Sequence, residues 1–318
     1  MQSAEYSSAS STMVPSVFRS SLRSFVRRGF VVACLSAAFA SPVWAQPAGR
    51  GPASSLNLTF SHSAESDADL PGRPAAGKLS VDAWSVSGKT TRMLRPGVFA
   101  SAGGTWERYE VDASSTLPVP KKLQGASLNL AVAMALDADW MLSLTVSPGF
   151  YAAGSSPGMD GFNAPGLLLG TRKISPTFSV AVGLRFDALS DNPILPIAGF
   201  RWQPAPEWTV SLGAPRTEAV YKVREGIEVF GGGSFQGGGF AIDDPQLRSS
   251  GTISLRDTYV DYREIRAGGG LRWALGKAVS LELEGGWVVD RRFDYYERSL
   301  EVKTDGASFW HVGLATRF

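Results

Sequence analysis

Cysteine, histidine and long apolar stretches are scarce in this chain. Cys34 is the only cysteine, and His62 and His311 are the only histidines, among 318 residues. One thiol cannot close a disulfide within the chain, and it lies in a segment expected to be removed, so disulfides, thiolate metal sites and cysteine nucleophiles are excluded. The longest apolar run, residues 30–44, has about fifteen residues, whereas a membrane-spanning helix needs about 20.

The N-terminal residues have the three parts of a secretory signal peptide. A basic stretch precedes the apolar run 30–44, and Val43-Trp44-Ala45 offers small residues at a cleavage point before Gln46. The pattern predicts a signal peptide over residues 1–45, with a start at Met1 or at Met13, which would give a more usual signal length. The residues of the basic stretch are Arg19, Arg23, Arg27 and Arg28.

Two other export signals overlap this segment. Val31-Val32-Ala33-Cys34 fits a lipoprotein box, but few apolar residues precede it and an apolar run follows it. Arg27-Arg28-Gly29-Phe30-Val31 resembles a twin-arginine signal, a route that carries folded cargo. A strand-rich membrane protein must cross the inner membrane unfolded, so an ordinary cleaved signal is the better interpretation.

Removal of the signal changes the charge of the chain. The whole sequence has a formal net charge of +2 and a pI of about 8.7. Residues 1–45 hold four Arg and one Glu, which leaves 27 basic and 28 acidic residues. The basic pI therefore belongs mostly to the signal, and the sequence indicates no nucleic-acid partner. A mature chain without thiols suits an oxidising cell envelope.

Apolar and polar residues alternate along many segments of the mature chain. The mean hydropathy is −0.02, as expected when each strand has one apolar and one polar face. The polar faces mix Gly and Ala with Arg and Glu, which favours a crowded barrel lumen over the exposed face of a soluble sandwich. The segments with the clearest alternation are 128–136, 178–187, 264–273 and 281–290.

The links between strands alternate in length, as in barrels with short periplasmic turns and longer outer loops. This alternation holds throughout only if 208–223 is two short strands broken near Pro215. The sequence then predicts an all-β, transmembrane, antiparallel up-and-down β-barrel of about 14 strands, with 12 as the fallback. The short links are 136–139, 175–176, 203–206, 224–226 and 276–278, and the long polar links are 63–78, 112–122, 152–165, 187–194, 243–255 and 294–306.

The barrel is expected over residues 56–318, after a flexible periplasmic segment at 46–55 that is rich in Gln, Pro, Ala, Gly and Ser. Tryptophan side chains fall near the expected strand ends, where an aromatic girdle belongs. These tryptophans are Trp106, Trp140, Trp208, Trp273, Trp287 and Trp310.

The final residues alternate back from an aromatic C-terminus, and this pattern resembles the closing strand of bacterial outer-membrane β-barrels. The resemblance implies the outer membrane of a Gram-negative-type bacterium, contact with its lipid, and the barrel-assembly machinery as a partner that reads the last strand. The residues of this assembly signal are Trp310, Val312, Leu314 and Phe318.

A finer resemblance covers about the last 125 residues. Gly199-Phe200-Arg201-Trp202, the glycine-aromatic stretch 231–238, Ala267-Gly268-Gly269-Gly270-Leu271 and Glu284-Gly285-Gly286-Trp287 carry it. The chain is similar to a domain-of-unknown-function family of outer-membrane β-barrel proteins from planctomycete-like bacteria. That family implies a location and a fold, and supplies no activity and no catalytic residues.

Catalytic and metal-binding patterns are weak, and we expect no enzyme and no cofactor. His311 would face the lumen, but no serine motif accompanies it as in outer-membrane lipid hydrolases. Asp67 and Asp69 near His62 lack the ligand run of a calcium loop. The glycines at 231–239 precede neither a lysine nor a helix, so they favour a curved strand over a phosphate cradle.

Charged residues on the polar faces give the only candidate site, a set of lumen-lining charges. If Gly276-Lys277-Ala278 form a turn, Leu275 pairs with Val279 and Arg272 lies opposite Glu282. A passive channel or transporter for small polar solutes is the first hypothesis, and a non-conducting structural or surface-binding envelope barrel is the alternative. A lipid-modifying enzyme comes a distant third. The candidate lumen charges are Arg185, Glu264, Arg266, Arg272, Glu282 and Glu284.

Overall fold

The computed structural model describes residues 53–154, 158–213, 215–242, 255 and 257–318. The predicted signal peptide, most of the predicted segment 46–55 and nearly all of the predicted loop 243–255 lie outside these residues. The first strand begins at Ala53, slightly before the expected start of the barrel at residue 56. Within the described part of the chain, no helix is long and apolar enough to cross a membrane.

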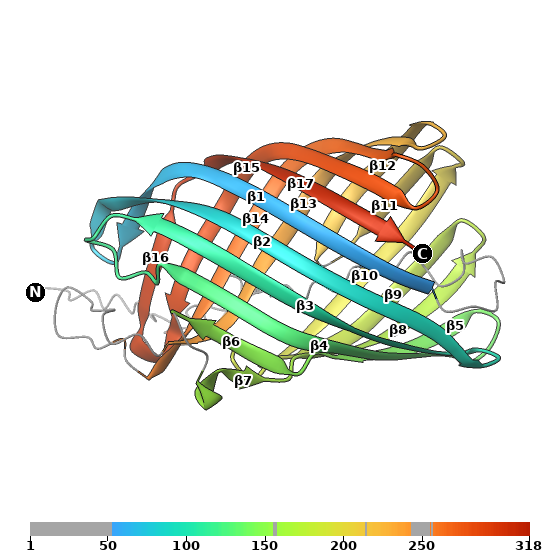
Figure 1. Ribbon diagram of the computed structural model, residues 1–318, viewed down its shortest axis with the longest axis horizontal. Coiled ribbons are helices and arrows are strands. Elements are labelled where there is room, and N and C mark those ends of the chain that lie inside the picture. Colours follow the sequence, from blue (N-terminus) through green and yellow to red (C-terminus); the bar gives the residue numbers. More distant parts are fainter. Residues whose placement is uncertain (1–52, 155–157, 214, 243–254, 256) are drawn as a thin grey trace, which may run out of the picture. The chain divides into compact units, whose positions relative to one another are not determined.

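Seventeen β-segments and two short 3₁₀ turns make up the described chain (Figure 1). Most connections are tight turns, because the strands run antiparallel to their sequence neighbours. The bounds are β1 Ala53–Leu70, β2 Arg73–Arg95, β3 Val98–Ala113, β4 Lys122–Ala135, β5 Trp140–Val146, β6 Gly149–Ala153, η2 Met159–Gly161, β7 Phe162–Asn163, β8 Gly166–Ser175, β9 Phe178–Phe186, β10 Ile194–Ala205, β11 Trp208–Leu212, β12 Arg216–Arg224, β13 Ile227–Ile242, β14 Thr258–Ala274, β15 Val279–Tyr295, η3 Tyr296–Arg298, β16 Leu300–Thr304 and β17 Ala307–Arg317.

The segments form one sheet that closes on itself, because β1 pairs with β2 on one side and with β17 on the other. Three strands are interrupted. The first consists of β5 and β6, which both pair with β4. The second consists of β7, which pairs with β6, and β8, which pairs with β5. The third consists of β16 and β17, which both pair with β15. The ring therefore has 14 strands, as predicted. The predicted break near Pro215 is confirmed, since it separates β11 from β12.

The predicted long link at 63–78 is wrong. β1 and β2 continue through it and turn at Pro71-Gly72. The predicted link 294–306 is likewise partly strand, because β15 runs to Tyr295 and β16 follows. Both stretches looked like loops because their outward side chains are polar, although their backbones are paired.

The strands reverse their polarity part-way along their length. On β14, Leu271 faces outward and Arg272 inward, whereas nearer the other end Arg263 faces outward and Tyr262 is buried inside. An outward band of aromatic side chains on the adjacent strands β15, β17, β1, β2 and β3 marks the change. Its members are Phe60, Trp84, Trp106, Trp287 and Trp310, of which Phe60 packs against Trp84 and Trp310. The prediction that Trp106, Trp287 and Trp310 lie near strand ends is therefore wrong, because the paired chain continues past them on both sides.

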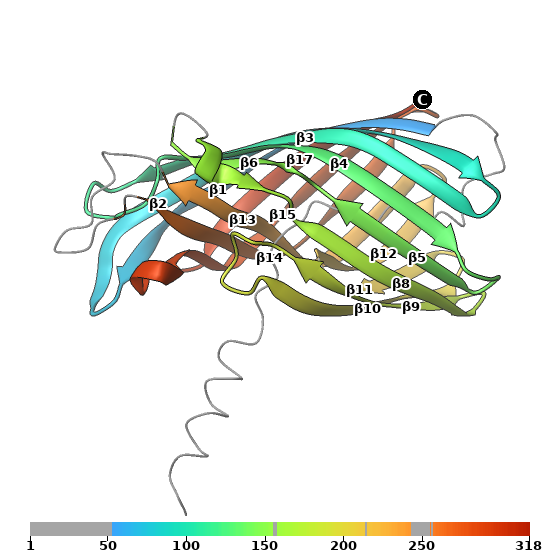
Figure 2. The ribbon, with the colours of Figure 1, turned by 90° about the horizontal axis from the view of Figure 1, so that it is seen from below.

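Beyond this aromatic band, the strands enclose an apolar core, and we call this part of the molecule the cap. β6 pairs in parallel with β13 there, which closes a smaller ring of nine strands (Figure 2). Each of the nine strands contributes to the core, together with loop residues 117–119. Core residues include Leu79, Val81, Leu123, Phe240, Val260, Tyr262, Phe293, Tyr295 and Val302.

Glycines permit close approach of the backbones of β13, β14 and β15 below the cap. On β13, β14 and β15, glycines at 231–233, 268–270 and 285–286 lie side by side. A β-carbon at Gly270 would lie 2.0 Å from the Leu283 carbonyl oxygen, so no larger residue fits between these backbones. The glycine-aromatic motif of the sequence is therefore structural.

Candidate functional site in the barrel interior

Below the cap, the side chains that face the interior are polar, and we call this part the lower lumen. Small hydroxyl and amide side chains line much of its wall, and they are half-exposed. Some bond along the wall, as where Asn129 Nδ2 donates to Thr105 Oγ1 at 2.7 Å. The lining includes Thr59, Ser87, Ser101, Asn129, Thr145 and Ser211.

An ionic layer of five side chains crosses one side of the lower lumen. β14 and β15 pair as predicted, with Arg272 opposite Glu282 and Gly270 opposite Glu284. Arg216, on β12, reaches Glu282, on β15, although two strands lie between them, so these side chains meet on the concave face of the sheet. The layer consists of Arg216, Glu218, Arg272, Glu282 and Glu284.

Each arginine of the ionic layer binds more than one carboxylate. Arg272 donates from Nε to Glu282 and from Nη2 to Glu218, both at 2.7 Å. Arg216 donates from Nη1 to Glu282 at 3.0 Å and from Nη2 to Glu284 at 2.8 Å. The planar guanidinium suits such multiple contacts. Three carboxylates against two guanidiniums give the layer a formal charge of −1.

Aromatic and imidazole rings hold the ionic layer in place. The guanidinium carbons of Arg216 and Arg272 lie 4.6 Å and 4.4 Å from the Phe230 ring centroid, close enough for cation–π attraction. His311 Nε2 lies 3.9 Å from Glu282 Oε1. His311 is therefore part of the wall and has no serine partner among the hydrogen bonds of the described residues.

Glu264 and Arg266 form a second, deeper group together with Arg291. Glu264 Oε1 accepts from Arg266 Nε at 2.5 Å, and Glu264 Oε2 accepts from Arg291 Nε at 2.6 Å. Arg266 and Arg291 also donate to the hydroxyls of Ser61 and Ser63 on β1. Glu264 and Arg291 are fully buried. This buried ionic cluster lies between the apolar core of the cap and the lower lumen.

Arg185 is separate from the other predicted charges. It is buried and donates to Asp187, which also accepts from Asn163 Nδ2 at 2.7 Å. The Nε and Nη1 groups of Arg185 are buried and have no hydrogen-bond partner. The six predicted charges thus lie in three groups rather than in one.

Three charged residues of the ionic layer and the buried ionic cluster were not predicted. Arg216 and Glu218 alternate with Thr217 in the sequence, so their shared face was detectable. The inward position of Arg291 was not detectable, because a β-bulge at Val289 shifts the pairing of β15 with β14 between Ile265 and Arg266 and reverses the faces beyond it. Strict alternation over 281–290 would put Asp290 on the polar inward face with Glu282 and Glu284, but the bulge turns it outward, where it pairs with Arg263 and Arg292.

The four residues of the predicted assembly signal lie on the outward face of β17. Trp310, Leu314 and Phe318 are exposed. Phe318 and Ser54 exchange two backbone hydrogen bonds, at 2.9 Å and 3.0 Å, where the last strand meets the first. The role of these residues in assembly stays a prediction.

Replacing Phe318 with serine is expected to reduce assembly and to leave the backbone bonds to Ser54 possible. The folded, heat-modifiable fraction on gels should fall severalfold. Thr316→Ser, on the same face, is the matched control and should assemble normally. Equal assembly of both variants would contradict a role for the terminal aromatic ring.

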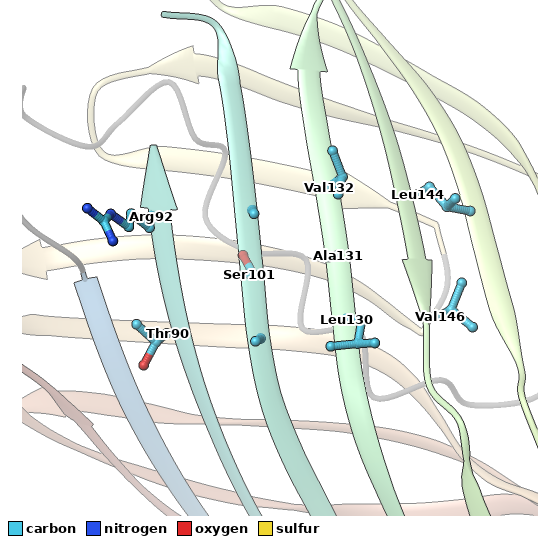
Figure 3. Close-up of a pocket in the computed structure, with 10 residues that line it drawn as sticks. Thr90, Arg92, Ser101, Leu130, Ala131, Val132, Leu144 and Val146 are labelled. Atoms are coloured by element: carbon cyan, nitrogen blue, oxygen red, sulfur yellow. The ribbon is translucent and has the colours of Figure 1, made fainter. Parts of the chain in front are cut away.

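The remaining candidates offer no ligand site. His62 Nδ1 lies 2.7 Å from Asp82 Oδ1, so it belongs to an outward hydrogen-bonded pair rather than to a calcium loop. Among the described residues, no group of histidine, cysteine and acidic side chains could hold a metal ion. A shallow apolar groove over β3 lies on the outward face, between Thr90 and Leu130 (Figure 3).

Several outer-membrane proteins of known structure are similar to this chain. A TodX monoaromatic hydrocarbon channel mutant has a TM-score of 0.51 at 12% identity, over 85% of this chain and 91% of that one. A FadL homologue of Pseudomonas aeruginosa has a TM-score of 0.45 at 10% identity, covering 84% and 90%. An outer membrane channel of Pseudomonas putida F1 has a TM-score of 0.46 at 12% identity, over 86% of this chain and 99% of that one. Only the first supports an argument, and it supports the fold alone.

No curated protein sequence matches this chain. One family model matches residues 95–316, from the last residue of β2 almost to the end of β17. This match spans more than half of the chain and includes the ionic layer and the buried ionic cluster. The chain therefore belongs to the family described as Domain of unknown function (DUF6268).

Proposed function

We propose that this protein is an outer-membrane channel or transporter for small polar solutes. The observation that carries the proposal is a closed 14-strand barrel with an apolar outward band and a polar, charged lower lumen. Between 8 strands, which side chains fill, and 16–18, which leave an aqueous channel, such a barrel is intermediate in width. Outer-membrane lipid would contact the apolar band.

The chemistry of the lower lumen favours polar solutes over hydrocarbons. The similar TodX protein is described as a monoaromatic hydrocarbon channel. In the present chain, however, hydroxyls, amides and the ionic layer line the interior below the cap. A hydrocarbon would gain little there, because it would displace water from groups that it cannot hydrogen-bond.

A second candidate function is a non-conducting envelope barrel. The apolar core of the cap favours it, since fully buried Leu79, Phe240 and Phe293 leave no straight axial path through this end. The buried Leu117-Pro118-Val119-Pro120 also packs into this end, and Tyr295 donates to the Pro118 carbonyl at 2.5 Å. An enzyme is not proposed, because in the described part of the chain His311 has no hydrogen-bonded serine beside it.

Electrical recording from the refolded protein in a planar bilayer distinguishes the two candidates. Stepwise single-channel currents in potassium chloride are expected for a channel. A folded, heat-modifiable protein that inserts and carries no current would contradict the channel and favour the envelope barrel.

Arg272→Gln is expected to make the channel more selective for cations. The substitution removes one positive charge from the ionic layer, so the potential near its three carboxylates becomes more negative. The cation-over-anion permeability ratio, measured from the reversal potential in a salt gradient, should rise roughly twofold or more.

Arg272→Lys is the matched control, because it keeps the charge and loses the planar fork. Its permeability ratio should stay near that of the unmodified protein. A ratio that Arg272→Gln leaves unchanged would mean that the ionic layer only stiffens the wall.

Export and assembly complete the proposal. We infer that a signal peptide over residues 1–45 is cleaved, that the barrel-assembly machinery inserts the chain, and that the cap faces the outside of the cell. The charged outward face of the cap, with Arg108, Arg263 and Arg292, supports this orientation, because it suits water and lipid headgroups. A planctomycete-like source stays a prediction.

A further inference from the structure

The cap covers only part of the barrel. Its nine-strand ring is closed by the pairing of Ala152 with Ala241 and of Ala153 with Ile242. The other five strands, β8 to β12 with the short β7 at the start of β8, take no part in this ring. The apolar core of the cap includes no residue of these five strands, so the end of the lumen in front of them lies outside that core.

Residues Asp187–Asn192, which we call the lid, extend across this uncovered end. The lid joins β9 to β10, which are neighbours in the sheet and need only a short turn. Instead, it reaches β13 and β14. A β-carbon at Gly239 would lie 2.2 Å from the Leu189 carbonyl oxygen, and Ser190 Oγ donates to Asp261 Oδ2 at 3.4 Å. Because β10, β11 and β12 lie between β9 and β13, the lid spans the outer ends of these three strands.

The lid is held by hydrogen bonds and by one buried apolar side chain. Leu189 is its only buried apolar side chain, and Ser190 and Asp187 are also buried. Asp187 holds the start of the lid to Arg185 and Asn163. A segment held by a handful of hydrogen bonds opens at a much lower free energy than the apolar core of the cap.

The chemistry next to the lid is that of a polar passage. Arg185 has two buried N–H-bearing nitrogens, Nε and Nη1, without a protein acceptor. Such a group is costly unless water or a solute oxygen supplies the missing bonds. Hydroxylated or anionic solutes provide such oxygens, whereas hydrocarbons do not.

From these observations we propose that small polar solutes pass beside the cap, between the lower lumen and the outside, and that the lid closes this passage. The proposal rests on the proposed channel function and specifies its route. The cap then remains shut, and opening requires only that the lid leave β13 and β14.

Two cysteine pairs test the route in a Cys34→Ser background purified from bacterial membranes. Ser190→Cys with Asp261→Cys ties the lid to β14. Oxidation should lower the single-channel open time at least tenfold, and a reductant should restore it. The reduced double variant serves as its own folding control.

Ala152→Cys with Ala241→Cys is the matched control, because it ties the two strands that close the cap. Oxidation of this pair should leave the current unchanged. A current that is lost on tying the cap, or that is insensitive to tying the lid, would overturn the proposed route. Failure of the 190–261 bond to form would also overturn it, because the lid would then not lie against β14.

Ser190→Ala tests the lid from the other direction. It removes one hydrogen bond to Asp261, so the open fraction should rise roughly two- to tenfold. An unchanged open fraction would contradict the lid. Absence of current from the unmodified protein would instead contradict the channel function on which this inference rests.

Discussion

Glu264→Ala is expected to destabilise the barrel more than any other single change to its charges, by about 3–5 kcal/mol. The substitution leaves Arg266 and Arg291 buried without their shared counter-ion. It also removes the acceptor of Gln236 Nε2 and of the Tyr262 hydroxyl. The free energy of unfolding in urea, measured in lipid vesicles, should fall by this amount.

Glu301→Ala is the control for this prediction. Glu301 binds Arg292 and Lys303 on the outward face of the cap, where water screens the pairs. Its loss should cost at most about 1 kcal/mol. Equal losses for both variants would mean that water reaches Glu264 and that the cluster is not sealed from the lower lumen.

Joint replacement of Glu264, Arg266 and Arg291 by apolar residues of similar size should cost less than Glu264→Ala alone. Burying an ion pair costs most of what its attraction returns, whereas leaving one ion unpaired costs the full desolvation. This result would identify the cluster as a device for fixing the register of β14 against β15 and β1 rather than as a source of net stability.

The strand count and the pairing of β14 with β15 were predictable because both follow from local pattern. Alternation with a period of two fixes which side chains share a face, and the short turn at Gly276-Lys277-Ala278 fixes which residues pair. Arg272 therefore had to lie opposite Glu282. The same reasoning, applied to Arg216 and Glu218, would have placed both side chains on an inward face. It would not have shown that Arg216 reaches past β13 and β14 to Glu282.

The cap was not predictable from alternation alone. A strand that is apolar inside and polar outside has the same period as one that is polar inside and apolar outside. Along β14, the apolar set shifts from the odd-numbered, outward Leu271 to the even-numbered, inward Tyr262, a change of phase that a β-bulge would also produce. On β15, the bulge at Val289 shifts the alternation by one residue, which moved Asp290 outward and Arg291 inward. Long-range pairing then decided which face was the interior.

The lid was also invisible in the sequence, for a different reason. Residues 187–194 have the composition and length of an ordinary outer loop, and residues 187–193 indeed form no helix or strand. Their importance comes from what they reach, namely Gly239 and Asp261, which lie 50 or more residues away in the chain. No local pattern reports such a contact.

Leu130→Arg, on the outward face of β4, is expected to cost about 2–4 kcal/mol if this face meets the middle of the bilayer. Leu130 is half-exposed, and its neighbours on the same face are the apolar Ala102 and Val146. A cation there must either enter hydrocarbon or draw water to it. Leu283→Arg, on the opposite side of the ring, should behave in the same way.

Ala131→Arg is the matched control, because the next residue along β4 points to the other face. Its arginine would enter the polar lower lumen beside Thr145, where water and hydroxyls solvate it. The free energy of unfolding should therefore change by less than about 1 kcal/mol. If Ala131→Arg were as costly as Leu130→Arg, the lower lumen would be packed rather than hydrated, and the polarity of the two faces would no longer support a channel.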